Sequence, residues 1–204
     1  MFGIGLTGGI GSGKTSVTER LAARGAVVVD ADVITHEIQR PGGPAFDPII
    51  ARFGEGVRAE DGTLDRPAIA KIVFNDPAAR ADLNAIVWPL VGEAMRERAE
   101  SLAETDEVAV FSIPIMRGEH RSRLGYQAIV VVDCPTEVAV ERLVAARGMD
   151  RDDALARIAA QTSREERLSW ADFVVDNSST LEHLDAEVDR LWAWVTERRA
   201  DGGT

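Results

Sequence analysis

The sequence predicts an α/β fold in which about five parallel strands form a sheet between two layers of helices. Five short apolar runs, rich in valine, are continuously rather than alternately hydrophobic, which is typical of strands covered on both faces. These runs lie at residues 2–6, 26–29, 108–111, 128–132 and 173–175. Helical segments separate most of them, so the alternation predicts a doubly wound, three-layer α/β/α fold.

Segments with helical spacing lie at residues 16–24, 136–147, 151–161 and 181–199. In the last of these, apolar residues recur at steps of three and four residues, as in a helix with one apolar face. They are Leu184, Val188, Leu191, Trp192 and Val195. This spacing predicts a C-terminal helix packed on the sheet.

The middle of the chain predicts a helical insertion between the second and third strands. Pro41-Gly42-Gly43-Pro44 breaks the chain, and helical patterns then run over about residues 66–103. Proline disrupts helices, so we expect interruptions at Asp76-Pro77 and at Trp88-Pro89.

The composition excludes several classes of partner. The net charge is -11, which is a poor match for nucleic acid or for an anionic membrane surface. No apolar stretch approaches the roughly 20 residues of a membrane-spanning helix, and the N-terminus lacks the pattern of a secretory signal. The single cysteine, Cys134, follows an apolar run and is interpreted as a buried core thiol in a reducing compartment. We therefore expect a cytoplasmic protein.

The strongest functional signal is a glycine-rich loop between the first strand and the first helix. Its residues 8–15 read GGIGSGKT and match the pattern G-x-x-x-x-G-K-[ST] in full. Glycines let backbone N–H groups turn inward toward phosphate oxygens, and the helix that follows presents its positive end to the same anion. The loop therefore predicts a binding site for a nucleoside triphosphate, of the kind found in P-loop NTPases. The alternative is a glycine turn that binds nothing. The position of the loop between a strand and a helix disfavours this alternative.

Two carboxylates follow the second strand at its carboxyl end, the side on which ligands bind in a parallel sheet. They are Asp30 and Asp32. On an extended segment the two side chains face the same side. Asp32 is then a candidate to orient and deprotonate an attacking hydroxyl. The alternative is that both carboxylates cap a helix beginning near Val33. His36 lies four residues after Asp32 and either touches substrate or packs.

These features together resemble the dephospho-coenzyme A kinase family. The resemblance runs from Gly5 to about Leu191 and rests on the order and spacing of several short motifs. The motifs lie at residues 6–15, 29–32, 41–45, 61–66, 159–161, 171–172 and 176–177.

The resemblance implies a single P-loop kinase domain, residues 1–204, made of three parts. The core comprises residues 1–35, 105–135 and 165–204, a helical substrate subdomain comprises about 36–104, and a small helical lid comprises about 136–164. The implied reaction transfers the γ-phosphate of ATP, with Mg²⁺, to the ribose 3′-hydroxyl of dephospho-coenzyme A, giving coenzyme A and ADP. We expect the protein to be a monomer and its partner to be this small-molecule substrate.

The resemblance also implies roles for individual residues. Asp32, Lys14 and Arg142 are the expected catalytic residues, and Thr15 is the expected metal ligand. The expected nucleotide-binding residues are Gly8, Gly9, Gly11, Ser12, Gly13, Lys14, Thr15, Ser16, Arg142, Arg147 and Asn177. The expected substrate-binding residues are Asp32, His36, Arg66 and Trp88.

Some of these assignments have alternatives. A solvated helix face fits Arg142 and Arg147 nearly as well as a lid that contacts phosphate, and Asn177 also fits an ordinary loop turn. Trp88 precedes Pro89 where many family members carry histidine, and it either contacts the substrate's apolar arm or packs. The segment 114–119 also departs from the family pattern, so Glu119 is given no role.

Other functions fit the same P-loop. Another small-molecule kinase, acting on a nucleoside monophosphate or a hydroxy acid, is the nearest alternative. A GTP-dependent switch is disfavoured because no Asn-Lys-x-Asp sequence occurs in the chain. An inactive binding protein is disfavoured by the presence of Lys14, Thr15 and Asp32 together.

Overall fold

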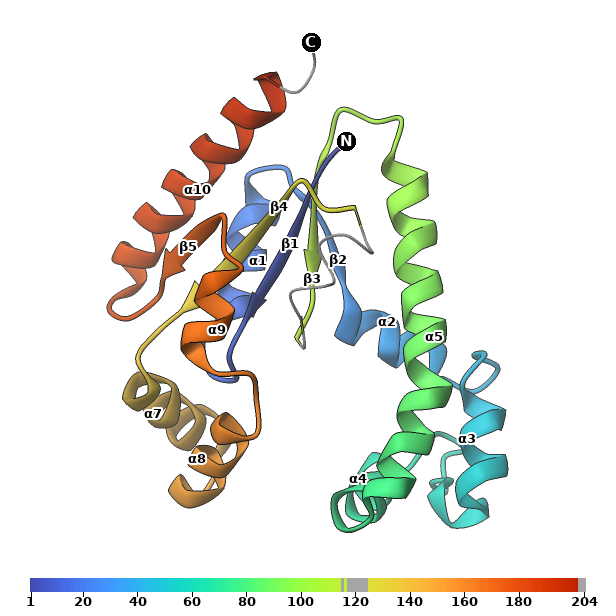
Figure 1. Ribbon diagram of the computed structural model, residues 1–204. Coiled ribbons are helices and arrows are strands. Elements are labelled where there is room, and N and C mark those ends of the chain that lie inside the picture. The colour runs from blue at the N-terminus through green and yellow to red at the C-terminus, as the bar shows by residue number, and fades with distance from the viewer. Residues whose placement is uncertain (115, 117–124, 202–204) are drawn as a thin grey trace. The chain divides into compact units, whose positions relative to one another are not determined.

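A computed structural model of the chain describes residues 1–114, 116 and 125–201 (Figure 1). The chain divides into two compact units. The first comprises Met1–Asp30 and Ser101–Thr204, and the second comprises Ala31–Glu100. Residues 202–204 lie outside the described residues, as does most of the segment 114–119.

The first unit is built on a sheet of five parallel strands, as the continuous apolar runs predict. The strand order is β2-β3-β1-β4-β5, and every neighbouring pair is parallel. The strands are β1 (Phe2–Gly8), β2 (Val27–Asp30), β3 (Val108–Ser112), β4 (Ala128–Asp133) and β5 (Phe173–Asp176).

Helices lie on both faces of this sheet (Figure 1). The helices of the first unit are α1 (Lys14–Ala23), α7 (Thr136–Arg147), α8 (Arg151–Ala159), α9 (Arg164–Ser169) and α10 (Leu181–Asp201). α1 and α10 pack against each other on one face. The connection from β1 to β2 and the connection from β4 to β5 run in opposite directions along the sheet. Because crossovers between parallel strands are right-handed, α9 covers the other face.

The two faces of the sheet are filled differently. On the α1 and α10 face, a cluster of fully buried aliphatic side chains forms the core, including Leu6, Leu21, Val130 and Leu191. On the other face, a Cβ on Gly5 would meet the ring of Tyr126 at 2.7 Å. A residue without a side chain is therefore required in β1 so that this aromatic ring can lie against the strand.

The second unit is helical, as the breaks and helical patterns after the second strand predict. Its elements are α2 (Ala31–Ile38), α3 (Phe46–Phe53), a single 3₁₀ turn (Glu55–Val57), α4 (Arg66–Asn75) and all but the last two residues of α5 (Pro77–Leu102). The 3₁₀ turn contacts both α3 and α4. Asp65 caps α4 by accepting a hydrogen bond from the backbone N–H of Ala68 at 2.9 Å, which satisfies a donor of the first turn.

One of the two expected helix interruptions is wrong. The break at Asp76-Pro77 is present, with Asp76 extended between α4 and α5. At Trp88-Pro89, however, α5 continues with Pro89 inside the helix. An interior proline removes one backbone hydrogen bond and costs about 3 kcal/mol. The buried side chains of Val87 and Met95, on either side of Pro89, offset this cost.

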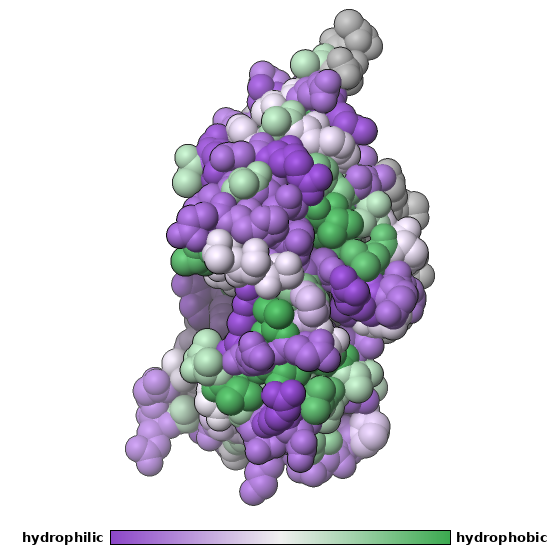
Figure 2. Space-filling model, turned by 90° about the vertical axis from the view of Figure 1, so that its left-hand side faces the viewer, coloured by the Kyte–Doolittle hydropathy of each residue, from purple (hydrophilic) through white to green (hydrophobic). Residues whose placement is uncertain are grey.

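The face of the molecule drawn in Figure 2 is mainly hydrophilic. Figure 2 shows one face on which hydrophilic side chains surround smaller hydrophobic areas. Among the described residues, the most exposed large apolar side chain is Phe74, at 83%. No described helix is both long enough and apolar enough to cross a membrane.

The apolar face of α10 leads to a prediction about stability. Leu191 is fully buried, whereas Leu181 at the start of the same helix is 64% exposed. We expect Leu191→Ala to lower the free energy of unfolding by about 3 kcal/mol because it leaves a cavity in the core. The matched control, Leu181→Ala, changes it by less than about 0.5 kcal/mol. Urea titration followed by circular dichroism measures both, and equal effects would contradict the packing described here.

Candidate active site

The glycine-rich loop forms an open cradle between β1 and α1. Gly11 and Gly13 have positive φ values, 78° and 88°, which the backbone of other residues adopts at a cost. Gly13 is the N-cap of α1, no side chain caps the helix, and its first turn carries no acidic residue. The N–H groups at this helix start, together with the positive end of the helix dipole, form a site for an anion.

The glycines are also required by their neighbours. A Cβ on Gly8 would lie 2.5 Å from the carbonyl oxygen of Val132, and a Cβ on Gly13 would lie 2.2 Å from Nδ2 of Asn177. Both distances are shorter than any real Cβ contact. The loop is therefore packed against β4 and against the residue that follows β5, with no space for a side chain at Gly8 or Gly13.

Polar side chains within the loop lie close to its backbone. Lys14 Nζ donates to the carbonyl oxygen of Gly8 at 2.8 Å and lies 3.5 Å from that of Gly9. Ser12 Oγ is buried and has no hydrogen-bond partner among the described residues. A buried hydroxyl without a partner is costly, so this atom has capacity for a ligand. Thr15 is exposed at the start of α1.

Asn177 and Arg142 meet the loop, and Arg147 does not. Asn177 Nδ2 donates to the carbonyl oxygen of Ser12 at 2.7 Å, and its Oδ1 accepts from Arg142 Nη2 at 3.4 Å. The other terminal nitrogen of Arg142, Nη1, is buried without a partner in the described part of the chain. Arg147 is exposed at the last residue of α7.

A cavity of about 420 Å³ opens beside the loop. It is lined by loop residues, by the end of β4 and the segment that follows it, and by residues 158, 159, 161–165 and 167. β1 and β4 are neighbours in the sheet, but their connections run in opposite directions, to β2 and to β5. Ligands bind in open α/β sheets at such a switch point, beyond the carboxyl ends of the strands.

The cavity lining includes residues that were not among the predicted site residues, and three of them are Gln161, Arg164 and Arg167. Gln161 Oε1 accepts from the backbone N–H of Ile10 at 2.9 Å. Arg164 donates to both carboxylate oxygens of Asp133, at 2.6 to 3.0 Å. Arg167 donates to the carbonyl oxygen of Thr162.

A sequence signal for this region does exist. Ser163 and Glu166 have the spacing of a capping box, which marks the start of a helix. In the structure, Ser163 Oγ accepts from the backbone N–H of Glu166 at 3.1 Å and α9 begins at Arg164. The contacts of Gln161 and Arg167 with the loop join distant parts of the chain, and this local signal does not predict them.

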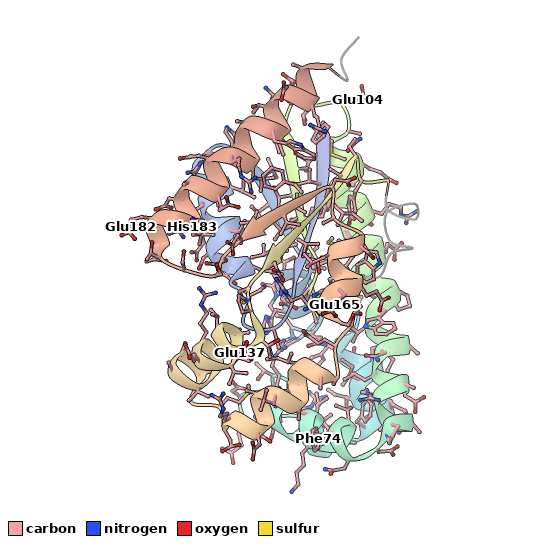
Figure 3. All side chains as sticks on the ribbon, turned by 60° about the vertical axis from the view of Figure 1, so that its left-hand side comes forward. Phe74, Glu104, Glu137, Glu165, Glu182 and His183 are labelled. Atoms are coloured by element: carbon pink, nitrogen blue, oxygen red, sulfur yellow. The ribbon has the colours of Figure 1, made fainter. Side chains whose placement is uncertain are left out.

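The charges around the cavity differ in their environment. The hydrogen bond with Asp133 raises the pKa of Arg164, whereas burial lowers the pKa of Arg167. Burial also raises the pKa of Cys134, so this cavity residue is a protonated thiol at neutral pH, as expected for a core cysteine. Figure 3 labels Glu137 and Glu165, two exposed carboxylates of the cavity lining carried by α7 and α9.

The predicted substrate-binding residues belong to the second unit. α2 begins at Ala31, so the expectation that Asp30 and Asp32 alternate on an extended segment is wrong. Asp32 lies in the first turn of α2 and His36 in the last, four residues apart and therefore on one side of the helix. Asp32 follows the carboxyl end of β2 by two residues.

Arg66 and Trp88 lie on separate helices of the second unit. Arg66 is the first residue of α4, and burial lowers the pKa of its guanidinium. Trp88 lies on α5 and is 56% exposed, which leaves its ring available for contact with a ligand. 

Comparison with known proteins identifies the family. The family model described as dephospho-CoA kinase matches residues 2–183. The chain belongs to the dephospho-CoA kinase family. It is 46% identical to the dephospho-CoA kinase of Thermobifida fusca over 97% of this chain and 98% of that protein. It is 45% identical to the dephospho-CoA kinase of Streptomyces avermitilis over 100% of this chain and 98% of that protein.

Solved structures agree with the fold. The structure of TT1252 from Thermus thermophilus has a TM-score of 0.75 and 29% identity, and the match covers 94% of this chain and 96% of that chain. The dephospho-CoA kinase from Campylobacter jejuni has a TM-score of 0.72 at 21% identity, covering 96% of this chain and 97% of that chain. The latter likeness supports the fold alone.

The crowding at Gly13 leads to a prediction about ATP binding. Gly13→Ala places a Cβ against Asn177 in a strained backbone conformation, so we expect it to lower the affinity for ATP at least about tenfold. The matched control is Gly25→Ala, since Gly25 has a φ of 98° but no atom within 4 Å of the added Cβ. Titration calorimetry compares the two variants. Equal ATP affinities would show that the contact with Asn177 does not shape the site.

Proposed function

We propose that this protein transfers the γ-phosphate of ATP to the ribose 3′-hydroxyl of dephospho-coenzyme A, giving coenzyme A and ADP. The observation that carries the proposal is the complete glycine cradle at the uncapped start of α1, in a chain of the dephospho-CoA kinase family. The cradle supplies a phosphate site, and the family supplies the acceptor.

The loop and its neighbours hold the nucleotide in this proposal. Backbone N–H groups between Gly8 and Ser16 surround the phosphates, and Lys14 exchanges its contact with the Gly8 carbonyl for phosphate oxygens. Asn177 and Arg142 bind the nucleotide where they meet the loop at Ser12 and Gly13. The guanidinium of Arg142 adds positive charge for the transfer step.

Arg147 is proposed as a second lid cation. It is exposed at the end of α7, in the proposed lid of residues 136–164, and makes no hydrogen bond or ion pair with the described part of the chain. Its charge is therefore available to a phosphate. Arginine suits this role because its planar fork can contact two phosphate oxygens together.

Mg²⁺ is proposed to bind mainly through the nucleotide. The described residues contain no group of three or more histidine, cysteine or acidic side chains that could hold a metal ion. Magnesium in kinases keeps several waters and takes phosphate oxygens with few protein ligands. The exposed hydroxyl of Thr15, at the start of α1, fits the role of its protein ligand. When bound, the ion would neutralise charge on the phosphates.

The acceptor is proposed to bind residues of the second unit. Asp32 orients the 3′-hydroxyl and accepts its proton, because a carboxylate can do both in a phosphoryl transfer. His36 lies on the same side of α2. Arg66 is suited to the anionic groups of the substrate, and the exposed Trp88 ring is suited to its apolar arm.

A panel of acceptors tests the reaction. We expect ADP release from MgATP to depend on dephospho-coenzyme A, with coenzyme A as the product identified by mass spectrometry. AMP, adenosine, shikimate, gluconate and a reaction without acceptor serve as controls. ADP release driven by one of these instead would overturn the acceptor while keeping the nucleotide site.

Asp32→Asn tests the proposed base. We expect kcat to fall by about 10²- to 10⁴-fold, the usual contribution of a positioned general base, while the Kd for ATP changes by less than about threefold. Asp47→Asn is the matched control, since Asp47 is an exposed aspartate of α3 in the same unit and its variant should keep full activity. An unchanged kcat in Asp32→Asn would show that Asp32 is not the base.

A further inference from the structure

Arg167 lies against the first residues of the phosphate loop. Its Nη2 is 2.9 Å from the position that a Cβ on Gly9 would occupy. The guanidinium therefore fills the space left by the missing side chain of Gly9. Arg167 also lines the cavity together with Gly9, Ile10 and Ser12, so one positively charged group is held at the edge of the cradle.

The side chain is held there by contacts within the same unit. Arg167 donates to the carbonyl oxygen of Thr162. Gln161 precedes Thr162 in the chain, and its Oε1 accepts a hydrogen bond from the backbone N–H of Ile10 at 2.9 Å. Ser163 caps the start of α9. The segment that carries Arg167 is thus attached to the loop itself, and a guanidinium positioned in advance loses little freedom when a ligand binds.

The two arginines of α9 differ in their counter-charges. Arg164 forms a bidentate ion pair with Asp133, and this carboxylate offsets the charge of Arg164. For Arg167, no carboxylate lies within ion-pair distance among the residues that the structure describes, and its side chain is half-buried. Partial burial of a cation without an ion-pair partner is unfavourable. The more distant charges of Asp133 and Glu165 oppose this effect, but burial outweighs them, so this position gains free energy when an anion enters the cavity.

We propose that Arg167 contacts the terminal phosphate of ATP bound in the loop and stabilises the phosphoryl group during transfer. This inference rests on the proposed function, in which ATP is the donor and Asp32 accepts the proton. In the transfer, the bond between the γ-phosphorus and the bridging oxygen breaks, and that oxygen leaves with ADP. A bond forms between the γ-phosphorus and the acceptor oxygen, whose proton passes to Asp32. Arg167 donates hydrogen bonds to the equatorial oxygens and keeps its own protons throughout.

Arg167→Ala tests this role with a matched control. Arg157 is an exposed arginine of α8, in the same part of the chain but outside the cavity lining. We expect Arg167→Ala to lower kcat by at least about 10²-fold, since arginines that contact a transferring phosphoryl group contribute about 10³ to 10⁵. Arg157→Ala removes the same charge and should keep kcat within about threefold of the original protein.

Nucleotide binding without acceptor separates this role from a structural one. In titration calorimetry, Arg167→Ala should weaken ATP more than ADP, by at least about fivefold in the ratio of the two Kd values. ADP affinity within about threefold of the original protein shows that the loop is folded. Added guanidine hydrochloride, at a concentration that leaves the protein folded, should restore part of the lost kcat.

Three results would overturn the proposal: an unchanged kcat, equal losses of ATP and ADP affinity, or no recovery of kcat with guanidine. The ratio of ATP to ADP affinity involves no acceptor, so it tests Arg167 even if the acceptor panel rejects dephospho-coenzyme A. In that case the kcat measurements use whichever acceptor the panel identifies. A failure of the proposed function is therefore distinguishable from a failure of this inference.

Discussion

The phosphate loop keeps its shape through a buried hydrogen bond from Asn177 Nδ2 to the carbonyl oxygen of Ser12, at 2.7 Å. A buried polar contact of this kind is expensive to lose. It joins the end of β5 to the loop that follows β1, although β4 lies between these strands. The need for glycine at position 13 and the attachment of Arg142 both follow from where Asn177 sits.

Positive charge at the loop is organised locally within an acidic chain. The net charge of -11 repels anions at long range, but salt screens that field beyond about 8 to 10 Å. Close to the loop, the start of α1, Lys14 and Arg167 present donors to the same region. Asp133 offsets Arg164 and leaves Arg167 as the guanidinium facing the cavity without a carboxylate partner among the described residues.

The sequence predicts the parts of this protein whose determinants are local. Strand–loop–helix order around Gly13 and continuous apolar runs predict the sheet and the P-loop, and these expectations are confirmed. The prediction of a helix break at Pro89 was wrong because packing of α5 outweighs the local cost of proline. Arg167 was missed because its significance depends on meeting Gly9, a residue at the other end of the chain. Local patterns carry no information about that pairing.

The insertion of the second unit has a consequence for how the sheet is assembled. β2 and β3 are neighbours in the sheet, yet the whole of Ala31–Glu100 separates them along the chain. Pairing them closes a long loop, and the entropy lost in closure grows with the logarithm of the number of flexible residues. Compaction of Ala31–Glu100 into its own unit before the strands pair would remove flexible residues from that loop. The segment that carries Asp32 and Trp88 therefore also governs how readily the strands beside the phosphate loop find each other.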